Sequence, residues 1–166
     1  MDGDRAPLAD LARLARSSGA RLIVDEAHAT GLFGATGAGR IEEEGVRKQV
    51  FASVHTCSKA LGQAGAFVCG SHELKQWLIN KARSFIYSTA PPPYLAAGLQ
   101  QAISIVQSQP ELRTRPQALA QQLRGALAGQ VDTGSSTTHI VPVLIGDEER
   151  TLAIAQALTR RGWQVR

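Results

Sequence analysis

A short apolar run that ends in an acid constrains the fold of this chain most strongly. Residues 21–25, Arg-Leu-Ile-Val-Asp, come directly after residues 7–18, in which leucines recur at helical spacing. A brief and continuous β-branched run is typical of a buried parallel strand, because helices cover both of its faces. Helix, short loop and buried strand is the repeat of an α/β protein. The sequence therefore predicts an α/β fold with a mostly parallel sheet and helices on both faces.

The rest of the chain continues this alternation. Further strands are predicted at residues 50–55, 64–69 and 139–145, with extended pieces at 85–87 and 163–166. Helices are predicted at residues 72–82, 94–107, 111–128 and 148–161, where prolines, glycines and a capping serine mark the ends. The glycine-rich residues 31–45 are predicted to form a flexible loop, and a domain change is predicted between residues 108 and 115.

The charge and composition of the chain limit the kinds of molecule that it is expected to bind. The net charge is +4, but the basic residues are scattered and lack the interleaved aromatics of a nucleic-acid groove. They are interpreted as a solvated surface, or more weakly as an attraction for an anionic substrate such as a nucleotide-bearing thioester. No apolar run approaches the ~20 residues that cross a bilayer, and the start resembles no signal peptide. We expect a cytoplasmic protein that binds neither membrane nor nucleic acid, with two free cysteines and no metal site.

The first candidate motif is Asp25-Glu26-Ala27-His28, directly after the predicted strand. Ligand sites in open α/β sheets lie at the carboxyl ends of strands, so Asp25 is expected to face a crevice. Read alone, Asp25 could equally be a helix cap or a loop acid, and His28 a structural hydrogen-bonding residue. A helicase-like reading of these four residues is disfavoured, because the sequence has no phosphate-binding G-x-x-x-x-G-K-[ST] loop.

The second candidate motif is Thr56-Cys57-Ser58-Lys59-Ala60-Leu61-Gly62, which follows another predicted strand. A lysine among small residues at a strand end suits an amine that forms a Schiff base, provided that partial desolvation lowers its pKa. Thr56 and Ser58 could offer hydroxyl and backbone N–H groups to a phosphate. The alternative is a surface lysine in a turn.

The third candidate motif, residues 87–93, places hydroxyls just before a helix that starts with prolines. Ser88 and Thr89 could bind an anion at the helix start, cap the helix, or do both.

Together, Asp-x-x-His, T-x-S-K-A-L-G and Y-S-T-x-P-P resemble the α-oxoamine synthases, a family of fold-type-I enzymes that use pyridoxal 5′-phosphate (PLP). The resemblance implies that Asp25 pairs with the pyridine nitrogen and that His28 bonds the ring's phenolic oxygen. It implies that Lys59 forms the Schiff base and moves the substrate's α-proton. Thr56 and Ser58 would lie at the phosphate, and Ser88 and Thr89 would reach the cofactor of the second subunit in a homodimer with shared sites.

Within that family, the sequence is most similar to the biotin-pathway member, which condenses L-alanine with an acyl thioester, pimeloyl-CoA or its carrier-protein equivalent, and releases carbon dioxide. Two alternatives stay open: another PLP enzyme of this fold, either a glycine- or serine-using synthase or an aminotransferase, and a non-catalytic remnant. Family members are more than twice as long. We therefore expect residues 1–108 to be the second part of the large PLP-binding domain and residues 109–166 an incomplete small domain. We expect such a part to be inactive alone.

Overall fold

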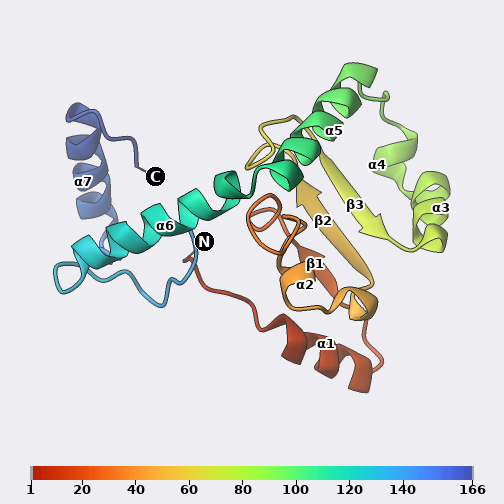
Figure 1. Cartoon of the computed structure of the whole chain (residues 1–166), viewed down its shortest axis with the longest axis horizontal. Coiled ribbons are helices and arrows are strands. Elements are labelled where there is room, and N and C mark those ends of the chain that lie inside the picture. Colours follow the sequence, from red (N-terminus) through yellow and green to blue (C-terminus); the bar gives the residue numbers. More distant parts are fainter. Residues whose placement is uncertain (1, 166) are drawn as a thin grey trace. The chain divides into compact units, whose positions relative to one another are not determined.

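The computed structural model describes residues 2–165 (Figure 1). The chain folds into two compact units. One consists of Ala6–Arg115, and the other of Met1–Arg5 with Pro116–Arg166. The candidate site residues named from the sequence all fall within the first unit.

A three-stranded sheet forms the centre of the first unit, in the order β1-β2-β3. Strand β1 (Ile23–Asp25) runs parallel to β2 (Ala52–Thr56), and β2 runs antiparallel to β3 (Ala66–Gly70). The three strands predicted for this region are confirmed, but the sheet is mixed. A parallel neighbour needs a long crossover connection, whereas only residues 57–65 join β2 to β3, so these two strands must run in opposite directions (Figure 1).

The buried core of this unit lies between the first helix, the first strand and the segment after it. Helix α1 (Leu8–Ser17) places Leu8 and Ala12 against Val24 of β1. Ile41 of the short helix α2 (Arg40–Glu43) and Val46, just before the 3-10 turn Arg47–Gln49, complete the cluster. Of the leucines and alanines whose spacing predicted this helix, Leu8 and Ala12 form the face that packs on the core, whereas Leu11 and Leu14 stay exposed.

Three helices follow β3. Helix α3 (His72–Lys81) begins as predicted at a capping serine, since Ser71 Oγ accepts from the Leu74 backbone N–H at 3.2 Å. The extended piece predicted at residues 85–87 is wrong, because the chain forms helix α4 (Arg83–Ile86) there and the Tyr87 N–H closes the turn on the Arg83 carbonyl. Helix α5 (Pro93–Ser108) starts at a proline as predicted.

Helix α6 (Pro110–Leu127) and helix α7 (Glu148–Arg160) agree with the predicted helices. The strand predicted at residues 139–145 is wrong: this segment has no regular structure. Its backbone finds other partners, because Leu144 N–H donates to the Asp132 carbonyl and the neighbouring Thr138 hydroxyl donates to the Gly3 carbonyl. Residues 163–165 form no strand either, and Arg166 lies outside the described residues.

Several large apolar side chains stay exposed in the first unit. Val68 of β3 is 51% exposed, Trp77 of α3 64% and Phe85 of α4 62%. The structure thus leaves large apolar side chains exposed on one strand and two helices. Among the described residues, no helix is both long and apolar enough to cross a bilayer.

Candidate functional site

The site begins where two parallel strands end at the same edge of the sheet. Asp25 is the last residue of β1 and lies in register with Val54 of β2. Its side chain is exposed, and its Oδ1 accepts from the Ala27 backbone N–H at 2.7 Å. Lys59 follows the end of β2 by three residues. The sheet therefore brings the carboxylate and the ammonium group to one edge, as predicted from the strand ends.

The charges of Lys59 and Asp25 both act on the imidazole ring of His28, in opposite directions. Burial lowers the pKa of the half-buried His28 imidazole, the positive charge of Lys59 lowers it further, and the negative charge of Asp25 opposes both. Both charges are thus near enough to act on one ring. With its pKa below the ordinary value, His28 is neutral near neutral pH and offers one N–H donor and one acceptor nitrogen.

Lys59 sits in a tightly closed loop. The loop is held where Cys57 N–H donates to the Gly65 carbonyl at 2.9 Å and Gln63 N–H donates back to the Cys57 carbonyl at 2.8 Å. Lys59 Nζ donates to Thr56 Oγ1 at 3.3 Å. Lys59 is exposed, however, so the described residues do not provide the partial desolvation that the sequence suggested. Ser58, also exposed, stands beside it in the same loop.

Ser88 and Thr89 lie in the irregular stretch between α4 and α5. Ser88 Oγ donates to the Ser84 carbonyl at 2.5 Å, which closes the end of α4. Neither residue caps α5, because Pro92 occupies the capping position and provides no side-chain hydrogen bond. The capping alternative is therefore wrong for this helix, and the anion-binding role stays a prediction.

Glu26 anchors the turn that carries His28, a role that the sequence did not reveal. Its side chain is only 1% exposed, and its carboxylate accepts from the backbone N–H groups of Arg40 at 2.9 Å and Ile41 at 2.7 Å. Its own N–H pairs with the Val54 carbonyl of β2. A buried carboxylate is tolerated only where hydrogen bonds replace its water, so Glu26 joins β1, β2 and α2 at one point.

Hydrogen bonds tie the glycine-rich loop to its surroundings, and its residues 40–43 form helix α2 instead of loop, while its flexibility stays a prediction. The Glu42 carboxylate accepts from Thr36 N–H and Oγ1 and from Ala38 N–H, while Arg113 Nη2 donates to the Ala35 carbonyl at 2.8 Å. Burial alone would raise the pKa of Glu42, but the hydrogen bonds from Thr36 and Ala38 and the charge of Arg113 lower it below its ordinary value. The Gly37 carbonyl then accepts from Gly31 N–H at 2.8 Å, which ties the loop to the end of the His28 turn.

A strand that ends in an acid, beside a parallel strand followed by a lysine, is the arrangement of the large domain of PLP-dependent transferases of fold type I. The family comparison agrees with this class. The model for aminotransferase class I and II matches residues 1–166, so the chain belongs to that family.

The chain is similar to proteins named 8-amino-7-oxononanoate synthase. It is 45% identical to the one from Anaeromyxobacter dehalogenans over 167 residues, which cover 100% of this chain and 42% of that relative. It is also 45% identical to the one from Cellvibrio japonicus, covering 98% of this chain and 41% of the relative. The chain thus spans less than half the length of these relatives.

Solved structures of related enzymes share the fold. A serine palmitoyltransferase from S. paucimobilis, with bound PLP and myriocin, has a TM-score of 0.93 at 32% identity and matches 100% of this chain and 44% of its own. The 8-amino-7-oxononanoate synthase from Francisella tularensis has a TM-score of 0.78 at 26% identity and matches 94% of this chain and 48% of its own. The predicted fold, the resemblance to α-oxoamine synthases and the PLP dependence of the family are confirmed.

Proposed function

We propose that the polypeptide carrying these residues is an α-oxoamine synthase that condenses L-alanine with pimeloyl-CoA, or pimeloyl carrier protein, to give 8-amino-7-oxononanoate. One observation carries the proposal: Asp25, His28 and Lys59 all lie at or just after the ends of two neighbouring parallel strands, and the charges of Asp25 and Lys59 both act on the His28 ring. The 45% identity to relatives of that name supports the choice within the family.

The donor set at this edge fits PLP. The exposed Asp25 carboxylate suits a protonated pyridine nitrogen, because an adjacent negative charge favours the protonated form. The neutral His28 can donate to the ring's phenolic oxygen, and Lys59 offers an amine to the aldehyde. When bound, PLP supplies an electron-withdrawing ring that stabilises negative charge at the substrate's α-carbon.

The chain's own residues would transfer the substrate's proton and bind the phosphate group of the cofactor. The Lys59 amine would hold the aldehyde carbon of the cofactor and, when free, would take the proton from the α-carbon of L-alanine. Thr56, just before the closed lysine loop, and Ser58, within it, would bind phosphate oxygens through hydroxyl and backbone N–H groups. Ser88 and Thr89 would bind the phosphate held by the second subunit of a homodimer.

A trapping experiment on the complete native polypeptide that contains residues 1–166 tests the cofactor role. After incubation with PLP and reduction with borohydride, peptide mass mapping should find the phosphopyridoxyl group on Lys59. The exposed Lys48 and the Lys59→Ala variant are the controls, and both should stay unlabelled. An unlabelled Lys59 in the wild type would instead support the non-catalytic remnant.

The choice of amino acid needs a separate measurement. The serine palmitoyltransferase structures favour a serine-using synthase as the second candidate, at 32% identity rather than 45%. Exchange of the α-proton with deuterated water, followed by NMR, should be fastest for L-alanine, and CoA release should then require pimeloyl-CoA. Faster exchange of L-serine or glycine would transfer the assignment to the relatives that use them.

We further propose that residues 1–166 alone lack synthase activity. The exposed Val68, Trp77 and Phe85 and the coverage of only 42% of a relative support this proposal. Purified residues 1–166 with PLP, L-alanine and pimeloyl-CoA should release no CoA. Turnover at a rate of about 1 s⁻¹ or more, which is typical of enzymes, would contradict it.

A further inference from the structure

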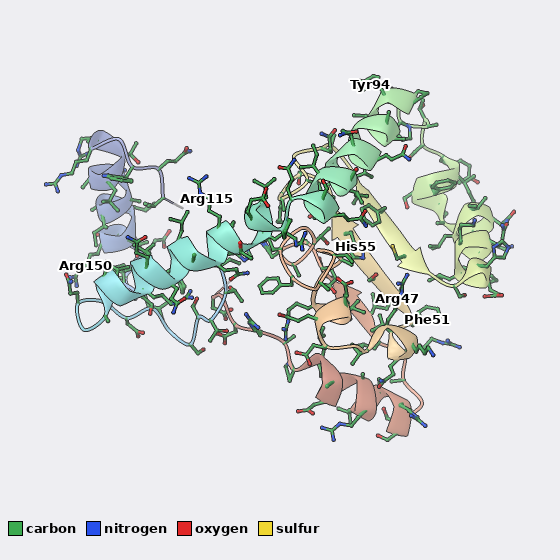
Figure 2. The ribbon with its side chains drawn as sticks, viewed as in Figure 1. Arg47, Phe51, His55, Tyr94, Arg115 and Arg150 are labelled. Atoms are coloured by element: carbon green, nitrogen blue, oxygen red, sulfur yellow. The ribbon has the colours of Figure 1, made fainter. Side chains whose placement is uncertain are left out.

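A buried polar group behind the candidate site has no role in the function proposed above. His55 of β2 is 7% exposed, and both of its ring nitrogens have partners. Nδ1 lies 2.7 Å from Thr30 Oγ1, and Nε2 lies 2.8 Å from Ser53 Oγ. The ring also stacks on Phe67 of β3, with centroids 4.8 Å apart and planes 7° apart. Figure 2 labels His55 on the sheet.

The hydrogen bonds assign the proton positions. Thr30 Oγ1 donates to the Glu26 carbonyl at 2.9 Å, so it accepts from the Nδ1–H of His55. Nε2 then accepts from the Ser53 hydroxyl. Burial lowers the pKa of His55, against the opposing charges of Glu26 and Asp25, which agrees with a neutral ring. A chain of hydrogen bonds therefore runs from β2 through His55 and Thr30 to the backbone of Glu26.

This chain of bonds joins the two segments that carry the candidate site. Thr30 lies two residues after His28 in the turn that follows β1, and His55 lies four residues before Lys59. The Thr30–His55 bond crosses between these segments, and each of the two side chains is only 7% exposed, at the wall of a pocket that is partly open to solvent. Loss of either partner leaves the other buried group with one protein hydrogen bond fewer. The Phe67 ring fixes the plane of the imidazole and hence the direction of its Nδ1–H.

We propose that Thr30 and His55 are positioning residues, whose hydrogen bond holds the His28 turn against the strand that leads to Lys59. The proposal rests on the function proposed above, because it takes His28 and Lys59 as the residues that meet the cofactor. Loss of the Thr30–His55 bond changes the orientation of His28 and Lys59 toward the bound cofactor, while both side chains stay present.

Substitutions at Thr30 and His55, with Ser53→Ala as a further control, separate this role from simple packing in the complete native polypeptide. Thr30→Ser keeps the hydroxyl and Thr30→Val removes it. His55→Asn places an amide near the Nδ1 position and can keep the Thr30 bond, whereas His55→Gln reaches the Nε2 position and keeps only the Ser53 bond. Both His55 variants lose the ring that stacks on Phe67, so they form a matched pair.

The readout is the pH midpoint at which the visible absorbance of the bound cofactor changes, since that midpoint reports the charges around it. Thr30→Val and His55→Gln should shift the midpoint in the same direction by at least about 0.5 unit, and the double variant should shift it no further. PLP should dissociate from both about two- to tenfold more readily. Thr30→Ser, His55→Asn and Ser53→Ala should keep the wild-type midpoint.

Three outcomes would overturn the proposal. An unchanged midpoint in a folded Thr30→Val variant would reduce the bond to a core contact, while leaving the proposed function intact. Equal midpoint shifts in His55→Asn and His55→Gln would show that the bond to Thr30 does not position the site. If Thr30→Val does not fold, the comparison of these two His55 variants tests the proposal by itself. A wild type that carries no PLP on Lys59 would overturn the proposed function and the positioning role with it.

Discussion

Gly31 lies directly against Ala60. A Cβ atom built on Gly31 would stand 2.8 Å from the Ala60 Cβ, closer than such atoms approach in real proteins. Gly31 also has φ +81°, a left-handed backbone conformation that side chains disfavour. A residue of the His28 turn therefore lies against the residue after Lys59, and only glycine allows the approach.

Gly31→Ala should consequently destabilise the complete native polypeptide by more than backbone strain alone. We expect a loss of about 2–4 kcal/mol in the free energy of unfolding, measured by urea denaturation, from the left-handed conformation together with the steric overlap. Labelling of Lys59 by PLP and borohydride should fall as well.

Gly45→Ala is the matched control. Gly45 has φ +66°, but a Cβ there meets nothing within 4 Å, so this variant should lose only about 1–2 kcal/mol and keep the labelling of Lys59. Equal losses in the two variants would show that Gly31 owes its importance to conformation and not to its approach to Ala60.

Glu26→Ala should be more damaging than the loss of an exposed acid. The substitution leaves the part-buried Arg40 N–H and the buried Ile41 N–H without their acceptor, at a cost of up to about 1–3 kcal/mol for each unsatisfied donor. Asp10→Ala, which removes an exposed ion pair with Arg13, should cost at most about 1 kcal/mol. Comparable urea midpoints for the two variants would contradict the anchoring role of Glu26.

Arg113→Ala should loosen the glycine-rich loop without unfolding the sheet. Arg113 donates to the carbonyls of Ala35 and Val106, and its loss removes a tie of the loop that is separate from the one made by Glu42. Amide hydrogen exchange at residues 34–39 should accelerate, whereas exchange in β2 should not. Arg115→Ala, at a nearby exposed position on α6, is the control. If exchange at residues 34–39 accelerated equally in this variant, the hydrogen bonds of Arg113 would not be what holds the loop.

The buried His55 should make stability depend on pH. Its pKa is lowered by burial in the folded protein, so below the ordinary value of 6.5 the unfolded chain binds more protons than the folded chain. The contribution of His55 is therefore complete above pH 6.5 and is lost as pH falls from there toward the folded-state pKa.

The slope of the unfolding free energy against pH can be measured by urea unfolding between about pH 7.5 and about pH 5.5. His55→Asn should flatten it, although not completely, since the lowered pKa of His28 gives a slope of the same sign. An unchanged slope in that variant would mean that His55 does not titrate in this range.

The sequence predicted the parts of the fold that depend on neighbouring residues. Asp25, His28 and Lys59 could be proposed from the sequence because each lies at or just after the end of an apolar strand with a clear local pattern. The prediction failed at residues 139–145, where apolar alternation favours a strand but the backbone bonds to Asp132 and Gly3 instead. A strand requires a partner, and no single segment encodes whether one is present.

The supporting contacts of the site were missed for a related reason. Glu26 pairs with residues 14 and 15 positions away, and Thr30 pairs with a residue 25 positions away. Neither spacing follows a helical or strand period, so nothing in the sequence marks these residues as partners. Only the burial of a carboxylate and an imidazole, seen in three dimensions, identifies them.

The sequence separations of these hydrogen-bonded residues also bear on the order in which the chain folds. The side-chain hydrogen bonds of Asp25, Glu26 and Thr30 described above join residues between 2 and 25 positions apart. The entropy lost on closing a loop rises only slowly with its length, so loops of up to 25 residues cost little more to close than shorter ones. We expect the His28 turn and β2 to assemble early, as a nucleus on which the remaining helices then condense.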